Sequence, residues 1–255
     1  MEANLLEVQG LVTEFDGLRA VDDVSFGVRP RTITGLIGPN GAGKTTVFNT
    51  VAGVCRPTRG AVRFNGEEIQ GLPTYRIFRK GLVRTFQIPR PFPEMTVLEN
   101  LVVVPQGQLG ERLWHVWFNR SGVRRQDRAI QDKAHEIIDF LNLRRVADEY
   151  AKNLSGGQLK LVEIGRALMS EPQMILLDEP GAGVNPTLLA EIMERIRELH
   201  QRGITFLLIE HNMDLVMSLC DPILVMAGGR LLMEGDAASV RSDQRVLDAY
   251  LGGGA

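Results

Sequence analysis

Residues 38–45 read Gly38-Pro39-Asn40-Gly41-Ala42-Gly43-Lys44-Thr45 and fit G-x-x-x-x-G-K-[ST], the pattern of a phosphate-binding loop. Glycines let successive backbone N–H groups curl around a phosphate, because that path needs positive φ angles and has no room for Cβ atoms. We expect Lys44 to reach the β- and γ-phosphates and the Thr45 hydroxyl to bind Mg²⁺. An apolar run at 32–37 predicts a strand before the loop, and 46–52 predicts a helix after it. This context favours a nucleotide site over a chance glycine turn.

The bulk composition limits the possible classes of protein. A chain of 255 residues is long enough for one large domain or for a core with an inserted lobe. Its net charge of −2 gives no basic field that would indicate nucleic-acid binding. Cys55 and Cys220 are isolated and are interpreted as reduced core cysteines of a cytosolic protein. We expect no transmembrane span or signal peptide, since no apolar run approaches the length of a span.

Short apolar runs on both sides of the loop predict further strands. Those at 5–15 and 24–28 precede the loop, and 60–66 follows it as a strand and turn. Phe15 could fold back and stack on adenine, or it could be an ordinary buried strand aromatic. The strand predicted at 81–87 ends on Gln87, which could orient water or contact Mg²⁺; taken alone, such a residue is more often a solvated strand end.

The pattern changes at Ile88, where three prolines in six residues precede helices up to about residue 170. This predicts a helical lobe inserted between strands of the α/β core. The stretch 96–99 fits a capping box. One face of a later helix would hold Ile130, Ala134, Ile137, Ile138 and Leu141.

Residues 105–128 combine aromatic and basic side chains. The residues concerned are Trp114, Trp117, Phe118, Arg120, Arg124, Arg125 and Arg128. They could form a surface for a membrane partner or lipid headgroups. The interpretation that we favour is packing inside the lobe, with a solvated charged face.

Three further stretches carry the polar groups expected beside a phosphate. Leu154-Ser155-Gly156-Gly157-Gln158 opens a helix with capping-box spacing, which is either a plain cap or an anion site. The apolar run at 174–177 ends in Asp178, suited to Mg²⁺, and Glu179, suited to a general base. The strand predicted at 204–209 delivers Glu210 and His211 to the same edge. His211 could hydrogen-bond the γ-phosphate, although a lone histidine is usually structural.

The remaining elements complete an α/β core. Asn185 can cap a helix that begins at Pro186 and has its core face at Leu189, Ile192, Met193, Ile196 and Leu199. Residues 222–227 and 230–234 predict a closing hairpin.

With these motifs in this order, the chain resembles the nucleotide-binding subunit of an ATP-binding-cassette (ABC) transporter over essentially its whole length. The resemblance makes 38–45 the Walker A loop, Gln87 the Q-loop, 154–158 the signature, and His211 the switch histidine. It makes Asp178 and Glu179 the Walker B pair and Phe15 the adenine-stacking aromatic. The implied fold is α/β: a P-loop NTPase ABC-cassette fold with a mixed sheet core, an N-terminal antiparallel β subdomain and an inserted α-helical subdomain.

The resemblance also implies how the domain is organised. The chain would be a single ATPase domain with its nucleotide-binding core at 1–87 and 171–255 and its helical subdomain at 88–170. ATP and Mg²⁺ would be the cofactors, and the catalytic residues would be Lys44, Gln87, Glu179 and His211. Metal binding would use Thr45, Gln87 and Asp178. The nucleotide-binding residues implied are Phe15, Gly38, Pro39, Asn40, Gly41, Ala42, Gly43, Lys44, Thr45, Thr46, Ser155, Gly156, Gly157, Gln158, Asp178 and Asn185.

ABC cassettes work as head-to-tail dimers, so Ser155 and Gly157 would contact the ATP that is bound to a partner subunit. Asn185 departs from the family, which commonly has an aspartate there, and its contact across the dimer would be a neutral hydrogen bond. The stretches 84–87, 105–128, 182–186, 210–213 and 250–252 are similar to ATPase subunits of branched-chain amino-acid importers. Urea and amide importers are close relatives.

This resemblance implies a set of partners and a location. The partners would be permease transmembrane subunits, a second ATPase subunit and, indirectly, a solute-binding protein outside the cell. The chain would be cytoplasmic and peripheral on the inner face of the cell membrane. Two alternatives rank lower. One is a soluble cassette ATPase acting on ribosomes or DNA, but such proteins usually have tandem cassettes, a coiled coil or a basic surface. The other is a kinase or GTPase, which would not require the 154–158 motif.

Overall fold

The computed structural model describes residues 3–85, 90–111 and 113–251. The chain forms two compact units. The first comprises the described residues of 1–87, 173–182 and 189–255, and the second those of 88–172 and 183–188.

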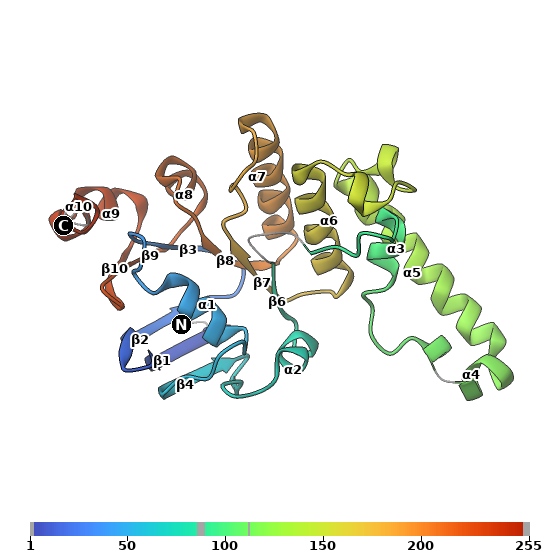
Figure 1. The fold of residues 1–255 in the computed structure, drawn as a ribbon, viewed down its shortest axis with the longest axis horizontal. Helices are drawn as coiled ribbons and strands as arrows, with labels where there is room; N and C mark the ends of the chain where they lie inside the picture. Colours follow the sequence, from blue (N-terminus) through green and yellow to red (C-terminus); the bar gives the residue numbers. More distant parts are fainter. Residues whose placement is uncertain (1–2, 86–89, 112, 252–255) are drawn as a thin grey trace. The chain divides into compact units, whose positions relative to one another are not determined.

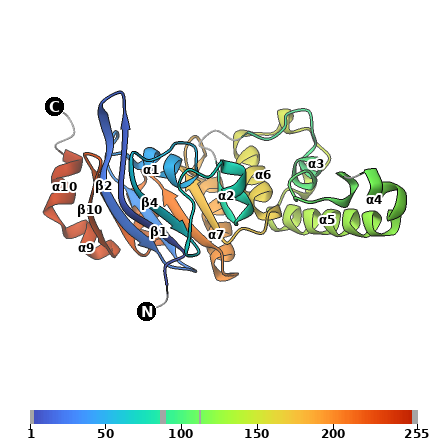
Figure 2. The same cartoon turned by 90° about the horizontal axis from the view of Figure 1, so that it is seen from below.

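The first unit contains an antiparallel sheet built from the N-terminal part of the chain (Figure 2). Its strands run in the order β2-β1-β4-β5. They comprise β1 (Leu6–Phe15), β2 (Leu18–Val28), β4 (Arg59–Phe64) and β5 (Glu67–Glu68). Asp16 and Gly17 both have positive φ angles, as a two-residue hairpin between β1 and β2 requires. The predicted N-terminal strands are confirmed.

The first unit also contains a six-stranded sheet in the order β10-β9-β3-β8-β7-β6 (Figure 1). All neighbours are parallel except the closing hairpin of β9 and β10. The strands are β3 (Ile33–Ile37), β6 (Leu82–Arg84), β7 (Met174–Asp178), β8 (Thr205–Ile209), β9 (Ile223–Ala227) and β10 (Arg230–Gly235). Every residue of β3, β7 and β8 is buried, as expected for central strands covered on both faces. Their carboxyl ends therefore meet at one edge, where ligands of α/β sheets bind.

Helices accompany these strands in the first unit. They are α1 (Lys44–Val51), α2 (Thr74–Arg79), α8 (Met213–Leu219), α9 (Ala237–Ser242) and α10 (Gln244–Leu251). Helix α7 (Pro186–Gln201) begins in the second unit and continues in the first. Asn185 caps it as predicted, its Oδ1 accepting from the Leu188 N–H at 3.0 Å. The predicted core face is buried at Ile192, Met193, Ile196 and Leu199, whereas Leu189 is only partly buried.

The second unit is helical. Its helices are α3 (Val97–Val102), α4 (Leu113–Phe118), α5 (Arg120–Phe140) and α6 (Gly156–Met169), with short 3-10 turns at Leu109–Glu111, Arg144–Val146 and Ala151–Asn153. Both predicted capping boxes are present, at Thr96 with Glu99 and at Ser155 with Gln158. The predicted apolar face from Ile130 to Leu141 is buried.

The interpretation of residues 105–128 as packed inside the helical lobe is wrong for the aromatic residues. Trp114, Trp117 and Phe118 are 76%, 74% and 79% exposed. The buried side of α5 begins only at Ile130, so its first turns cover no core that could receive these rings. The first turns of α5 instead pack against α4 and the short turn before it. There the Leu109 N–H donates to Gln126 Oε1 at 2.6 Å.

The two cysteines have different environments, which predicts different reactivity. Cys220 is buried, and burial raises the pKa of its thiol to about 12, whereas Cys55 is half-buried. The thiolate is the nucleophile, and at pH 8 only about one Cys220 in ten thousand would be ionised. We expect a thiol reagent at pH 8 to label one cysteine rapidly in the native chain and two in guanidinium. Cys55→Ser should abolish the rapid label, and two rapid labels in the native chain would contradict this account.

Candidate active site

The phosphate-binding loop joins the end of β3 to the start of α1. Gly38 has φ 150°, and a Cβ atom there would lie 2.1 Å from the carbonyl oxygen of Met226 on β9. No other residue fits so close to a neighbouring strand. Gly43, with φ 96°, precedes the first residue of α1. The sheet and the helix thus fix both ends of the loop.

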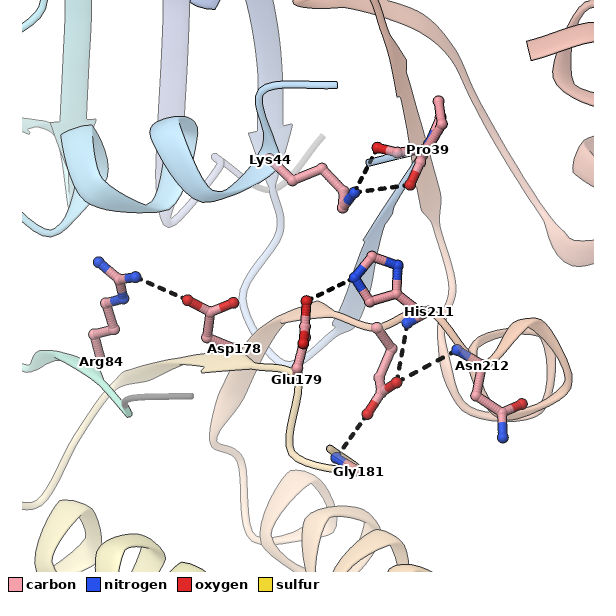
Figure 3. A network of polar contacts seen from close by, with 10 residues as sticks. Pro39, Lys44, Arg84, Asp178, Glu179, Gly181, His211 and Asn212 are labelled. Atoms are coloured by element: carbon pink, nitrogen blue, oxygen red, sulfur yellow. Dashed lines mark hydrogen bonds and ion pairs between the residues drawn. The ribbon is translucent and has the colours of Figure 1, made fainter. Parts of the chain in front are cut away.

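Lys44 is buried and lies against this loop (Figure 3). Its Nζ donates to the carbonyl oxygens of Gly38 at 2.7 Å and Pro39 at 3.0 Å. Burial lowers the pKa of the Lys44 ammonium, and the charges of Glu179 and Asp178 oppose that shift. The ammonium is therefore held between the loop and two acids at the ends of the sheet strands.

Asp178, the last residue of β7, is buried and paired with Arg84 of β6 (Figure 3). The Arg84 Nη2 donates to Asp178 Oδ2 at 2.8 Å, and its Nη1 donates to the Asn49 side chain on α1 at 2.6 Å. Arg84 therefore links β6, β7 and α1. No sequence pattern indicates this link, because the three residues lie far apart in the chain.

Glu179 and His211 contact each other although 32 positions separate them. The His211 Nε2 lies 2.6 Å from Glu179 Oε1 (Figure 3). Glu179 has φ 49°, a left-handed conformation that non-glycine residues seldom adopt and that is common at functional sites. The Glu179 backbone N–H donates to the Ile209 carbonyl at 2.9 Å, so the ends of β7 and β8 hold this conformation.

Glu210 is a residue whose role sequence reasoning missed. Its side chain is buried and accepts from three backbone N–H groups. Oε1 accepts from Gly181 at 2.7 Å, and Oε2 accepts from His211 at 3.0 Å and Asn212 at 3.4 Å. The carboxylate thereby fixes the loop after β7 to the segment that carries His211. A buried acid at the end of an apolar strand is the only signal that the sequence offers.

We expect Glu210→Gln to weaken both the fold and the site. The glutamine amide would present N–H₂ to a backbone N–H, leaving one buried donor without an acceptor, which costs about 1–3 kcal/mol. Urea unfolding should show that loss, and turnover of ATP should fall because His211 is no longer held. Glu234→Gln, on an exposed position of β10, is the matched control and should change neither quantity. Unchanged stability and turnover in Glu210→Gln would contradict this role.

The other predicted site residues of the first unit occupy different environments. Thr45 is exposed and Thr46 half-buried at the start of α1. Phe15 is 47% exposed at the end of β1, so its interpretation as a buried strand aromatic is wrong. Gln87 lies outside the described residues. In α10, burial raises the pKa of the Tyr250 phenol, and a hydrogen bond with the Gly38 backbone opposes that shift, so the C-terminal helix also reaches the phosphate loop.

The signature stretch and the loop with Asn185 meet within the second unit. Ser155 caps α6, and its backbone N–H is bound by Gln158 Oε1 at 2.9 Å. A Cβ atom on Gly157 would lie 1.7 Å from Leu188 Cδ2, so a larger residue there would require the Leu188 side chain to move. The first turn of α6 therefore packs against the first turn of α7.

The oxygen donors at the sheet edge fit a hard cation such as Mg²⁺. The Thr45 hydroxyl and the Asp178 carboxylate are the ligand types that Mg²⁺ takes beside nucleotide phosphates. The described residues contain no cluster of three or more acidic, histidine or cysteine side chains that could hold a metal ion.

None of the helices within the described residues has the length and apolar character needed to cross a bilayer.

Comparisons with known proteins agree over almost the whole chain. A family model described as "ABC transporter" matches residues 21–182, and one described as "Branched-chain amino acid ATP-binding cassette transporter" matches residues 230–255. The probable branched-chain amino acid transport ATP-binding protein LivG of Archaeoglobus fulgidus is 45% identical over 97% of this chain and 95% of its own length. BraF of Pseudomonas aeruginosa, a high-affinity branched-chain amino acid transport ATP-binding protein, is 43% identical over 99% of each chain.

Solved structures support the same fold. The crystal structure of a nucleotide-free ATP-binding cassette from an ABC transporter has a TM-score of 0.83 and 39% identity, covering 97% of this chain and 98% of that chain. The ADP conformation of the cassette MJ1267 has the same score and identity over 98% of this chain and 99% of that chain. The predicted α/β cassette fold, with its antiparallel sheet, mixed sheet and helices, is confirmed.

Proposed function

This chain belongs to the ABC transporter family of ATP-binding proteins, and from that premise we propose that it powers an importer of branched-chain or other hydrophobic amino acids. It is an ATPase, as the family match and the relatives indicate. The C-terminal match at residues 230–255 and the names of the relatives support this substrate class.

The observation that supports ATP hydrolysis at this site is the grouping of Lys44, Glu179 and His211 at the carboxyl edge of one sheet. We propose that the loop from Gly38 to Thr46 cradles the phosphates and that the Lys44 ammonium leaves its loop carbonyls for the β- and γ-phosphate oxygens. The Glu179 carboxylate accepts a proton from the attacking water as the water oxygen bonds to the γ-phosphorus. The bond to the ADP oxygen then breaks, giving ADP and phosphate.

His211 and the metal ligands complete this arrangement. The contact between His211 Nε2 and Glu179 Oε1 orients the carboxylate, and His211 is also within the region of the γ-phosphate that we propose. We propose Thr45, Asp178 and Gln87 as the groups that hold Mg²⁺. When bound, Mg²⁺ neutralises charge on the β- and γ-phosphate oxygens. The Arg84 guanidinium donates to Asp178 Oδ2 and so fixes the position of this carboxylate.

Further nucleotide contacts would come from Phe15 and from a second subunit. The exposed ring of Phe15 is available to stack on adenine. We propose that residues 154–158 and Asn185 contact the ATP that is bound to a partner ATPase in a head-to-tail dimer. Asn185 Oδ1 already caps α7, so its amide N–H₂ is the group that we assign to the contact across the dimer.

The proposed machine includes other proteins. Two permease subunits would dock on the helical subdomain at 88–170, the core at 1–87 and 171–255 would hold ATP, and a solute-binding protein would deliver the amino acid outside. The chain would be peripheral on the inner face of the cell membrane. Closure of the dimer on ATP would move the permease helices, and hydrolysis would reset them.

Purification of the tagged chain from gently solubilised native membranes tests this function. We expect two permease subunits and a second ATPase to copurify, and we expect the reconstituted complex to accumulate leucine only with ATP. The matched Glu179→Gln complex should assemble equally but transport nothing. Copurification with ribosomes or nucleic acid, and with no membrane protein, would overturn the transport proposal. The assignment of the ATPase site would still stand.

A further inference from the structure

Helix α4 presents three large aromatic side chains to solvent. Trp114, Trp117 and Phe118 are about three-quarters exposed and share one helical stripe, since residues three and four apart are neighbours on a helix. The rings of Trp114 and Phe118 stack with centroids 6.0 Å apart and an interplanar angle of 16°. Each ring has about 150–250 Å² to bury, so this stripe is a strong candidate for contact with another surface.

Arginines gather on the first turns of α5, which follows α4 directly in the chain (Figure 1). An open concavity there is lined by Arg120, Ser121, Arg124, Arg125 and Arg128. No salt bridge to Arg124, Arg125 or Arg128 occurs among the residues that the structure describes. We call the three rings and the four arginines the aromatic–arginine surface.

The charge of this surface departs from that of the whole chain. Between residues 105 and 128 there are five arginines, no lysine and only two acids, although the chain carries a net charge of −2. A guanidinium group binds phosphate oxygens in a bidentate manner, which an ammonium group does not. The complementary ligand is therefore rich in phosphate and also offers an apolar layer to the rings.

We propose that the aromatic–arginine surface docks on the anionic phospholipid headgroups of a bilayer. The tryptophan rings lie at the boundary between headgroups and acyl chains, where amphipathic aromatic rings are favoured, and the guanidinium groups bind lipid phosphates. The inference rests on the proposed function, which gives this chain a place at a membrane. The contact would hold the helical unit at the bilayer independently of the permease.

The geometry favours a lipid over a protein partner. The protein counterpart of an arginine-rich surface would be a patch of carboxylates, whereas a bilayer supplies phosphate groups and an apolar layer side by side, as the arginines and the rings together require. Shallow insertion into a bilayer needs no matching surface, because lipids adapt to the inserted side chains. Four arginines on two turns of helix likewise find phosphates at any spacing in an anionic leaflet.

Tryptophan fluorescence tests the proposal without any label. The chain has two tryptophans, both in α4, so its tryptophan emission reports this surface alone. Vesicles of mixed phosphatidylglycerol and phosphatidylcholine should shift the emission to shorter wavelength, and brominated acyl chains should quench it. Vesicles of phosphatidylcholine alone should have little effect, and salt should reverse the binding.

Variants should separate the two parts of the surface. Each arginine near an anionic leaflet is worth about fivefold in binding, so Arg124→Gln with Arg125→Gln should weaken vesicle binding about tenfold or more. Trp114→Ser with Phe118→Ser should reduce insertion while Trp117 remains as the reporter. The matched control is Arg144→Gln with Arg145→Gln, an exposed arginine pair in the same unit that should bind vesicles normally.

Three results would overturn the proposal. One is unchanged emission with anionic vesicles, and another is the full emission change with inorganic phosphate alone, which would indicate an anion site without a lipid role. The third is a change with detergent-solubilised permease but none with vesicles, which would indicate a protein docking surface. ATP turnover of the soluble variants, measured in parallel, should be normal. Absence of ATP turnover in the unmodified chain itself would instead count against the proposed ATPase site.

Discussion

Replacing Glu179 with glutamine is expected to lower ATP turnover by about 10²–10⁴-fold, the usual contribution of a general base, while ATP still binds. The amide keeps the size of the carboxylate but cannot accept the proton of the attacking water. Because ATP then persists in the site, the variant should also accumulate as a closed dimer. Phosphate release measures turnover, binding of a fluorescent ATP analogue measures affinity, and size-exclusion chromatography with ATP measures the dimer.

A double-mutant cycle tests whether Glu179 and His211 act together. Their side chains lie 2.6 Å apart, so their effects should not add. His211→Ala should lower turnover on its own, and Glu179→Gln with His211→Ala should be no slower than Glu179→Gln. Wild-type turnover in Glu179→Gln would remove this residue from the role of base. Strictly additive losses would instead show that the two side chains act independently.

Replacing Lys44 with alanine is expected to weaken ATP binding by about 2–5 kcal/mol, the cost of truncating one partner of a buried charge pair. The ammonium is buried beside the loop and is the cation that we assign to the β- and γ-phosphates. Burial lowers the pKa of Lys44, which means that its charge is costly in the protein without a compensating anion. The free energy of unfolding should therefore fall little, or even rise, while affinity is lost.

Isothermal titration with ATP and urea unfolding separate these two effects. The matched control is Lys80→Ala, which removes a partly exposed lysine paired with Glu67 and should leave ATP affinity unchanged. Retention of wild-type affinity in Lys44→Ala would contradict the assignment. A large loss of stability together with affinity would instead make Lys44 a structural residue of the loop.

Much of the fold and of the candidate site could be predicted from the sequence, because short local patterns indicate both the strands and the polar residues that follow them. The apolar runs that become β7 and β8 end directly at Asp178 and just before His211, so parallel pairing alone brings these side chains to one edge. Both capping boxes were evident from spacing, since each bond joins residues three positions apart. Catalytic and ligand roles remain predictions, and Gln87 lies outside the described residues.

Contacts between distant segments could not be predicted in the same way. Glu210 accepts from the backbone of Gly181, and backbone N–H groups have no sequence signature. Arg84 binds Asp178 and Asn49 through long side chains whose direction only the packed strands determine. The rings of α4 were misjudged because an aromatic stripe is usually a core face, and only the position of α5 shows that no core lies beneath it.

The pairing of β3 sets the order in which a growing chain can fold. Ile33 pairs with Phe206, so the strand before the phosphate loop can pair only after a strand about 170 residues further on has been synthesised. At ribosomal rates of about 5–20 residues per second, that wait lasts on the order of 10–30 s. The antiparallel sheet of β1, β2 and β4 needs only residues 6–64 and can form long before then. Translation therefore completes the pairing partners of the N-terminal sheet first, whereas β3 gains its neighbours β8 and β9 only after residues 205–227 have been made.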